Sequence, residues 1–205
     1  MIYLLGASGH AKVIIEILEL QGKAIGGLYD ENINIKFLMG YPVKIYTSEI
    51  LQISKENLLI TIGSNIIRKK LALENKCNYT LAIHPNTNIS KRALILNGTV
   101  IMAGVSINAD TRIGFHCIIN TNASIDHDCY LEDYVHISPN AALAGNVIVK
   151  EGAHIGIGAC IIQGVKIGRW STIGAGAVII DDVPDFAIVV GNPGKFKKFN
   201  KNYAK

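Results

Sequence analysis

The second half of the chain is built on a six-residue hydrophobic pattern. All seventeen positions from Ile83 to Ile179, taken in steps of six, hold isoleucine, leucine or valine. The position four residues after each of them, from Thr87 to Val183, always holds a small or β-branched side chain. A fixed short period is typical of a solenoid in which each repeat forms one strand and one turn. The small residue and the next aliphatic residue share one face of a strand, and we expect that face to point inward.

Three of these six-residue repeats make one triangular coil of 18 residues. The stretch 83–183 therefore predicts nearly six coils, stacked at the ~4.8 Å spacing of neighbouring strands. Glycine, asparagine and aspartate residues between the strands supply the turns. The pattern predicts a parallel β-helix whose interior is filled mainly by isoleucine.

The first eighty residues follow a different pattern, in which strands alternate with helices. The opening segment, IYLLGASGHAKVIIEILELQGKAIGGLYDE, predicts a strand, a glycine turn, a helix that ends at Gly22 and a strand over residues 25–29. The buried stripe of this helix is predicted to be Val13, Ile14, Ile17 and Leu18. A later strand at 58–63 precedes a helix over 66–74. The segment therefore predicts a small Rossmann-like α/β domain with a parallel sheet.

These patterns divide the chain into an α/β domain (1–80), a β-helix domain (81–185) and a basic C-terminal tail (186–205). Five of the twenty basic residues lie in the last eleven positions: Lys195, Lys197, Lys198, Lys201 and Lys205. The remaining 15 basic and 16 acidic residues nearly balance, so a nucleic-acid-binding patch is not predicted. The tail is either solvated or attracts a phosphorylated ligand.

Composition excludes several other classes of protein. The first residues, MIYLLGASGH, carry no basic start, and their apolar run is too short for a signal peptide or membrane span. We therefore expect a cytoplasmic protein with no membrane partner. The four cysteines lack CxxC spacing, so neither a zinc site nor a disulfide framework is predicted.

The GASGH turn at residues 6–10 stands between the first strand and the first helix. This context places backbone amides at a helix N-terminus, where a diphosphate could bind, although a tight turn without a ligand has the same pattern. Asp30 and Glu31 follow the second strand, which delivers them to the carboxyl edge of the sheet.

His127 lies between two carboxylates in the stretch SIDHDC. It occupies the third position of its repeat, close to a corner, so its side chain points outward. Imidazole accepts protons near neutral pH, and either Asp126 or Asp128 could hold its other ring nitrogen. Gly145 follows one coil later, roughly 5 Å along the stack. Its amide could stabilise an oxyanion, or it could be an ordinary corner glycine.

His136 lies nine residues after His127, half a coil away, so the two side chains leave different sides of the prism. A site that contains both requires two subunits. We therefore predict a homotrimer, with outward apolar surface supplied by Ile118, Ile148 and Val178. His154 is expected to pack one coil above His136, and His116 and His84 are expected at the surface.

A GASGH domain joined directly to a hexapeptide coil resembles the hexapeptide-repeat acyltransferases of the sialic acid O-acetyltransferase type. Within that family the chain is most similar to the N-acetyltransferases of nucleotide-linked 4-amino sugars, which serve bacterial glycan and lipopolysaccharide biosynthesis. The resemblance rests on the GASGH turn, the acidic pair, a GxNxxR segment, a histidine followed by a carboxylate, and a YVHIS stretch. It implies a left-handed coil, acetyl-CoA as co-substrate and no metal.

The resemblance also implies roles for individual residues. Catalytic roles fall to His127, Asp128 and Gly145. Substrate-binding roles fall to Gly6, Ser8, Gly9, His10, Asp30, Glu31, Gly63, Asn65, Arg68 and Asn120. Cofactor-binding roles fall to His136, Gly145, Gly191, Pro193 and Lys195. The last three belong to a GNPGK stretch, where the family often has GxPAK.

The leading hypothesis is acetyl-CoA-dependent N-acetylation of a nucleotide-diphospho-4-amino-4,6-dideoxy sugar, with uridine and thymidine both open as the base. The alternative within the family is O-acetylation of a sialic acid or related sugar. A metal-dependent hydratase on the same coil needs histidine pairs 36 and 5 residues apart, and no such pairs occur. A solenoid that only binds a ligand is the non-enzyme alternative.

Overall fold

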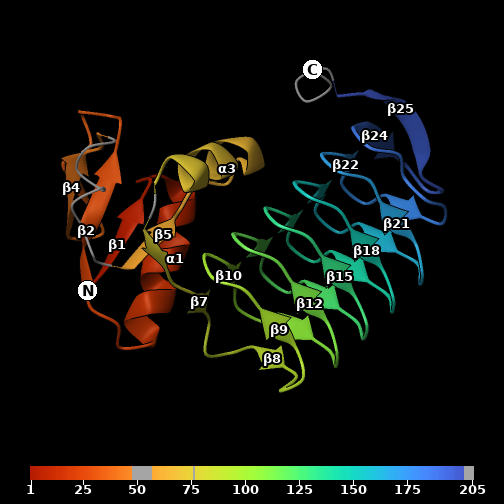
Figure 1. Cartoon of the computed structure of the whole chain (residues 1–205), viewed down its shortest axis with the longest axis horizontal. Coiled ribbons are helices and arrows are strands. Elements are labelled where there is room, and N and C mark those ends of the chain that lie inside the picture. The colour runs from red at the N-terminus through yellow and green to blue at the C-terminus, as the bar shows by residue number, and fades with distance from the viewer. Residues whose placement is uncertain (48–56, 76, 201–205) are drawn as a thin grey trace.

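The computed structural model describes residues 1–47, 57–75 and 77–200, which form an α/β domain beside a long prism of stacked coils (Figure 1). The α/β domain contains a six-stranded sheet with the order β3-β4-β2-β1-β5-β6, parallel except for β3. Its strands are β1 (Ile2–Leu5), β2 (Ile25–Asp30), β3 (Phe37–Leu38), β4 (Tyr41–Ile45), β5 (Asn57–Ile60) and β6 (Asn78–Tyr79). Its helices are α1 (Gly9–Leu20) and α3 (Asn65–Glu74).

The two helices cover opposite faces of this sheet because side chains alternate along each strand. Leu4 and Leu59 pack with α1, whereas Leu5 and Leu58 pack with Leu71 of α3. The buried stripe of α1 differs from the prediction, since its members are Ala11, Ile14, Ile15, Ile17 and Leu18. Val13 is 37% exposed, because it faces an open groove rather than the core.

The prism has three faces, each a ladder of short parallel strands. The first face contains β7 (Ala82–Ile83), β10 (Val100–Ile101), β13 (Ile118–Ile119), β16 (His136–Ile137), β19 (His154–Ile155) and β22 (Thr172–Ile173). The second contains β8 (Asn88–Ile89), β11 (Ser106–Ile107), β14 (Ser124–Ile125), β17 (Ala142–Leu143), β20 (Cys160–Ile161) and β23 (Val178–Ile179). The third contains β9 (Leu94–Ile95), β12 (Arg112–Ile113), β15 (Tyr130–Leu131), β18 (Ile148–Val149) and β21 (Lys166–Ile167).

The 18-residue coil sets the register of every ladder. Ile119 pairs with Ile137 and Ile137 with Ile155, so identical interior side chains stack directly above one another and are fully buried. At the corners the backbone repeatedly adopts a positive φ, as at Asp110 and Asp128. Asparagine and aspartate tolerate this conformation better than other non-glycine residues, which explains their recurrence at these positions.

The α/β domain packs on the lower part of the first face. Val100, Met102 and Ile118 form one buried cluster with α1. Ile118 is consequently only 1% exposed, so its predicted place in an outward apolar surface is wrong. Ile118, Ile148 and Val178 lie on three different faces, because a step of 30 residues is not a whole number of coils.

The last coil continues beyond residue 186, where the sequence pattern predicts the start of a tail. Strand β24 (Ala187–Val190) pairs in parallel with β22, and β25 (Lys195–Phe199) returns antiparallel to it. The apolar run AIVV explains the difference, since Ala187 and Val189 point into the core. Lys201 and Lys205 lie outside the described residues. Within the described ranges, neither helix has the length and apolar character needed to cross a membrane.

Candidate active site

His127 follows β14 at the corner between the second and third faces, and its side chain is 60% exposed. Its ring Nδ1 lies 2.8 Å from Asp128 Oδ2. An ionised carboxylate only accepts hydrogen bonds, so Nδ1 carries the proton and donates it, and Nε2 is left as the free acceptor. The corner geometry therefore selects Asp128 over Asp126 as the partner of the ring.

Asp126 holds the backbone rather than the ring. Its Oδ1 accepts hydrogen bonds from the His127 amide at 2.8 Å and from Asn108 Nδ2 at 2.7 Å. These two bonds, the Asn108 bond first, lower the pKa of Asp126. The hydrogen bond to Asp128 raises the pKa of His127 above its ordinary value, and the charge of Asp126 adds to the effect.

Gly145 lies against the imidazole ring, one coil above it. A Cβ at this position would stand 2.6 Å from His127 Cε1 and 2.8 Å from Nε2, so only glycine fits. The backbone of Gly145 is not in the left-handed region that turn glycines such as Gly152 and Gly158 adopt. Gly145 is therefore not an ordinary corner glycine. Among the described residues, none accepts a hydrogen bond from its amide.

His136 and His154 lie on the first face, in neighbouring strands. Their rings stack with centroids 4.7 Å apart and planes 2° from parallel. Asn120 Nδ2 lies 3.2 Å from His136 Nε2, and His154 Nε2 lies 2.8 Å from Ser138 Oγ. Burial, and then the neighbouring His154, hold the pKa of His136 well below its usual value. His136 therefore stays neutral, and its contact with Asn120 brings together two predicted site residues.

The N-terminal part of the predicted site divides into two places. Gly6, Asp30 and Glu31 line a cavity of about 310 Å³ at the carboxyl edge of the sheet, together with Tyr46, Ile62 and Lys70. Asp30 Oδ2 accepts a hydrogen bond from the Ala7 amide at 2.6 Å, so this carboxylate also holds the GASGH turn. Gly6 has a φ of 114°, and a Cβ there would stand 2.7 Å from Ile62, so the turn requires glycine.

The second place lies where the α/β domain meets the prism. Ser8 precedes α1 as its N-cap, and Gly9 and His10 begin the helix. Burial, and then the charge of Arg68, lower the pKa of His10 to about 4. The backbone of Gly63 forms a hydrogen bond with the His136 side chain, which connects this end of the α/β domain to the Asn120 side of the prism.

Arg68 is 1% exposed and joins the two parts of the molecule. Its guanidinium donates to the carbonyls of His116 (2.7 Å) and Tyr134 (2.9 Å) on the prism and to Ile62 (3.0 Å) and Asn65 Oδ1 (2.9 Å) in its own domain. These hydrogen bonds give Arg68 a structural role at the junction, and its predicted contact with a substrate stays a prediction. Asn65 works beside it, since Asn65 Nδ2 donates to the Gly152 carbonyl at 3.0 Å.

His116 is not at the surface, contrary to the sequence-based expectation. It is 4% exposed, makes an edge contact with Tyr79 at 4.4 Å and stacks on Tyr134 at 5.5 Å. Burial, and then Arg68, lower its pKa to about 4. The repeat gives no signal for this, because the α/β domain covers only some of the coils.

The GNPGK residues lie at the far end of the prism. The Gly191 carbonyl accepts a hydrogen bond from Val178, which stands three coils above Ser124 on the second face. Lys195 begins β25 and is exposed. Gly191, Pro193 and Lys195 are thus well separated from His136, with which the sequence grouped them. In the part of the chain that the structure describes, no three His, Cys, Asp or Glu side chains converge as metal ligands would.

The arrangement around His127 suits acyl transfer. An exposed imidazole whose Nδ1 is held by a carboxylate presents Nε2 as a proton acceptor. The amide of Gly145 stands beside it as a donor for a developing oxyanion. Within one chain His127 does not reach Asn120 or His136, because Asn120 leaves a different corner of the prism and His136 lies in β16 on the first face.

Comparisons with known proteins agree with this arrangement. Residues 1–74 match the PglD N-terminal domain family. A mutant of perosamine N-acetyltransferase from Caulobacter crescentus, solved in complex with CoA and GDP-perosamine, is 37% identical over 96% of both chains, with a TM-score of 0.92. The acetyltransferase domain of PglB from Neisseria gonorrhoeae, in complex with acetyl coenzyme A, is 35% identical over 96% of this chain and 98% of that domain, with a TM-score of 0.89. These likenesses confirm the predicted fold, an α/β domain followed by a left-handed parallel β-helix.

Two curated proteins match part of the chain. UDP-N-acetylbacillosamine N-acetyltransferase from Bacillus subtilis is 41% identical over 108 residues, which are 49% of this chain and 50% of that enzyme. Protein L142 of Acanthamoeba polyphaga mimivirus is 30% identical over 114 residues, which are 55% of this chain and 23% of that protein. The chain thus spans half or less of the length of these curated relatives.

Proposed function

Since this chain belongs to the hexapeptide-repeat acyltransferases of the sialic acid O-acetyltransferase type, the family of perosamine N-acetyltransferase, we propose that it transfers acetyl from acetyl-CoA to a nucleotide-linked 4-amino sugar. The observation that carries the proposal is the His127–Asp128 pair packed beneath Gly145. Two of the relatives described above, from C. crescentus and B. subtilis, are named N-acetyltransferases, which favours N-acetylation over O-acetylation of a sialic acid.

In the proposed reaction the amine of the sugar attacks the thioester carbonyl, and His127 Nε2 takes the proton that the nitrogen loses. Asp128 keeps the proton on Nδ1 and stabilises the imidazolium that forms. The Gly145 amide donates to the oxyanion of the tetrahedral intermediate. When the C–S bond breaks, the proton passes from His127 to the thiolate of CoA, so the enzyme returns to its starting state.

The nucleotide end of the acceptor is proposed to bind at the carboxyl edge of the α/β sheet. The cavity lined by Gly6, Asp30 and Glu31 supports this, because it joins the GASGH turn to an acidic pair. Carboxylates can accept hydrogen bonds from the N–H groups of a base. The base is open among uridine, thymidine and, from the complex of the C. crescentus neighbour, guanosine. The product is expected to enter bacterial glycan biosynthesis.

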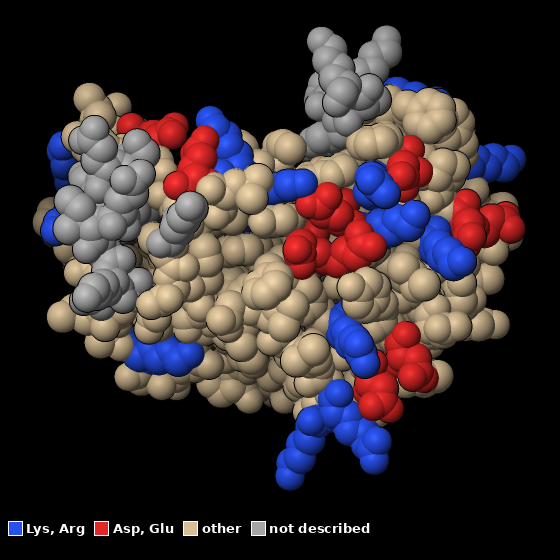
Figure 2. All heavy atoms as spheres, viewed as in Figure 1, with Lys and Arg blue, Asp and Glu red and all other residues tan. Residues whose placement is uncertain are grey.

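A homotrimer is part of the proposal, and the three faces of the prism support it. The lower first face is covered by α1, and Figure 2 shows charged side chains around the third face, whose strands β12 and β21 also point Arg112 and Lys166 outward. The outward residue of each strand of the second face is instead small, beginning with Asn88 in β8 and Ser106 in β11 and ending with Val178 in β23. A three-fold axis beside that face would bring the His127 corner of one copy against the Asn120 corner of the next. Both halves of the site would then meet.

Activity assays with His127 variants test the proposal directly. The protein is incubated with acetyl-CoA and a panel of UDP-, dTDP- and GDP-linked 4-amino sugars, with free sialic acid as comparison, and products are identified by mass spectrometry. His127→Ala and His127→Asn should each reduce kcat about 10²- to 10⁴-fold with little change in KM. Near wild-type turnover in both variants would overturn the role given to His127. Acetylation of sialic acid alone would overturn the proposed acceptor.

A further inference from the structure

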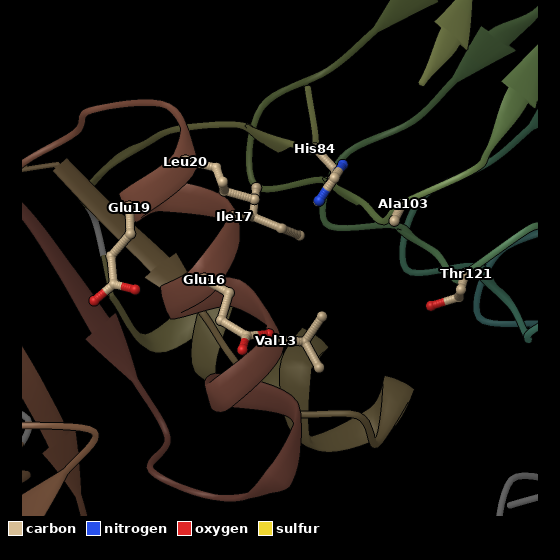
Figure 3. Close-up of a pocket in the computed structure, with 8 residues that line it drawn as sticks. All are labelled: Val13, Glu16, Ile17, Glu19, Leu20, His84, Ala103 and Thr121. Atoms are coloured by element: carbon tan, nitrogen blue, oxygen red, sulfur yellow. The ribbon is translucent and has the colours of Figure 1, made fainter. Parts of the chain in front are cut away.

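A groove of about 480 Å³ runs between α1 and the lower coils of the prism (Figure 3). Val13, Glu16 and Leu20 lie on its helical wall, and His84, Ala103 and Thr121 lie on the opposite wall. This acidic groove is separate from the cavity proposed for the nucleotide, since the two share no residue. Val13 is 37% and Leu20 61% exposed, so apolar surface of this helix remains uncovered in the single chain.

The acidic groove follows the corner between the first and second faces. Gln21 Nε2 donates to the Ile83 carbonyl at 2.7 Å, which fixes the C-terminal end of α1 at the first coil. From the first coil the groove extends along the prism, because Ala103 and Thr121 in its wall are 18 residues, or one coil, apart. The groove therefore reaches the coil that contains Asn120. Glu16 is exposed on its helical wall and supplies the negative charge of the groove, and the last turn of α1 contains no basic residue. Glu19 points away from the groove (Figure 3), where its Oε1 accepts a hydrogen bond from Tyr41 Oη at 3.0 Å.

A matching group of positive charges lies at another corner of the same coils. Lys91 and Arg92 are exposed between β8 and β9, at the corner between the second and third faces. Figure 2 shows Lys and Arg side chains projecting from the end of the prism that carries β8 and β9. This basic corner stands two coils below His127 and Asp128, since both residues differ from them by 36.

The spacing of the repeat connects these two features. Two coils below Asn120 is His84, in the wall of the acidic groove, and two coils below His127 is Lys91. In a trimer with its axis parallel to the prism, coils of neighbouring copies stand at equal heights. If His127 of one copy meets Asn120 of the next, Lys91 then reaches His84 and the acidic wall beside it.

We propose that the acidic groove between α1 and the prism is the docking seat for the Lys91–Arg92 corner of a second copy of this chain. The inference rests on the trimer in the proposed function. Opposite charges across an interface fix its register and disfavour wrong alignments. The negative end of the α1 dipole adds to the attraction for cations. The groove thereby sets the height at which His127 enters the neighbouring site.

Charge reversal tests the pairing, with sedimentation velocity over a range of protein concentrations as the readout. Glu16→Lys, and separately Lys91→Glu with Arg92→Glu, should each raise the concentration of half-dissociation of the trimer at least about tenfold. Combining the two sets should restore most of the wild-type assembly. Lys166→Glu, an exposed reversal on the third face, is the matched control and should change nothing.

The outcomes separate the two proposals. A wild-type protein that is monomeric while active overturns the trimer and this inference together. A wild-type trimer that is unchanged by the reversals overturns the docking seat alone. Dissociation of both reversed sets without recovery in the combined variant overturns the pairing of the groove with the basic corner. Circular dichroism on each variant verifies that the coil is retained.

Discussion

At the level of single residues, the hydrogen bond between His127 and Asp128 predicts the pH dependence of the reaction. The bond raises the pKa of His127, and only neutral imidazole accepts a proton, so kcat falls as pH drops through that raised pKa. Asp128→Asn removes the main cause of the shift. The acidic limb of the kcat profile should therefore move to lower pH, while the plateau falls on the order of 10²-fold. An acidic limb that stays in place would contradict the role of Asp128.

Gly145→Ala is the second prediction at this scale. The added Cβ would stand 2.6 Å from His127 Cε1, closer than such atoms approach, so the ring must turn away from Asp128. We expect kcat to fall at least about tenfold with the KM for the nucleotide sugar nearly unchanged. Gly164→Asn gives the comparison at a site away from the imidazole, because Gly164 has open space around it and a left-handed φ of 74° that asparagine tolerates, as at Asn146 one coil below. Steady-state kinetics on both variants measure the difference.

Among the elements, α3 attaches the α/β domain to the prism through buried hydrogen bonds, in addition to the apolar contacts of α1. Arg68→Met should lower the free energy of unfolding by on the order of 3–5 kcal/mol, because buried carbonyls of His116 and Tyr134 lose their donor. Lys70→Met on the same helix should cost less than about 0.5 kcal/mol, since Lys70 is exposed and its contact with Glu74 is long. Denaturant unfolding compares the two, and equal losses would contradict the assigned role.

The junction between α3 and the prism also makes stability depend on pH. The pKa of His116 is about 4 in the folded chain, below the ordinary 6.5, so under pH 6.5 the unfolded chain binds the proton more readily. The stabilisation is complete above pH 6.5 and declines as pH falls, by on the order of 3 kcal/mol near pH 4. His116→Asn, which tolerates the positive φ at this position, should flatten the decline. Urea unfolding at pH 7 and pH 5 measures it.

The elements also show how far sequence can predict this molecule. The period of six places Ile119 and Ile137 inside and His127 outside, because every coil repeats the same geometry. The junction between the two parts has no period, so His116 and Ile118 were assigned to the wrong environments. The choice of Asp128 over Asp126 likewise depends on a corner backbone that the residue types do not specify.

For the whole molecule, the proposed trimer predicts that inactive subunits rescue one another. A site in a mixed trimer needs His127 from one copy and Asn120 from its neighbour. Equal mixtures of His127→Ala and Asn120→Ala subunits, refolded together, should regain about a quarter of the wild-type activity. His127→Ala mixed with Asp128→Ala should regain none, because both residues come from the same corner. Recovery in neither mixture would mean that each subunit builds its site alone.

Gly145 is the single glycine among the seventeen third-position residues from Pro85 to Asp181. The other third-position residues have a Cβ that points toward the coil below. Ala109 and Gln163 are two of them, and they stand at the same corner as His127 and Gly145, at 18-residue steps. An engineer could not install a second catalytic corner by Ala109→His alone, because the new ring would strike the Cβ of His127. Moving the His127–Asp128 pair along the prism requires substitutions in two successive coils, a histidine in one coil and a glycine in the next. The proposed reaction is thereby confined to one height of an otherwise repetitive prism.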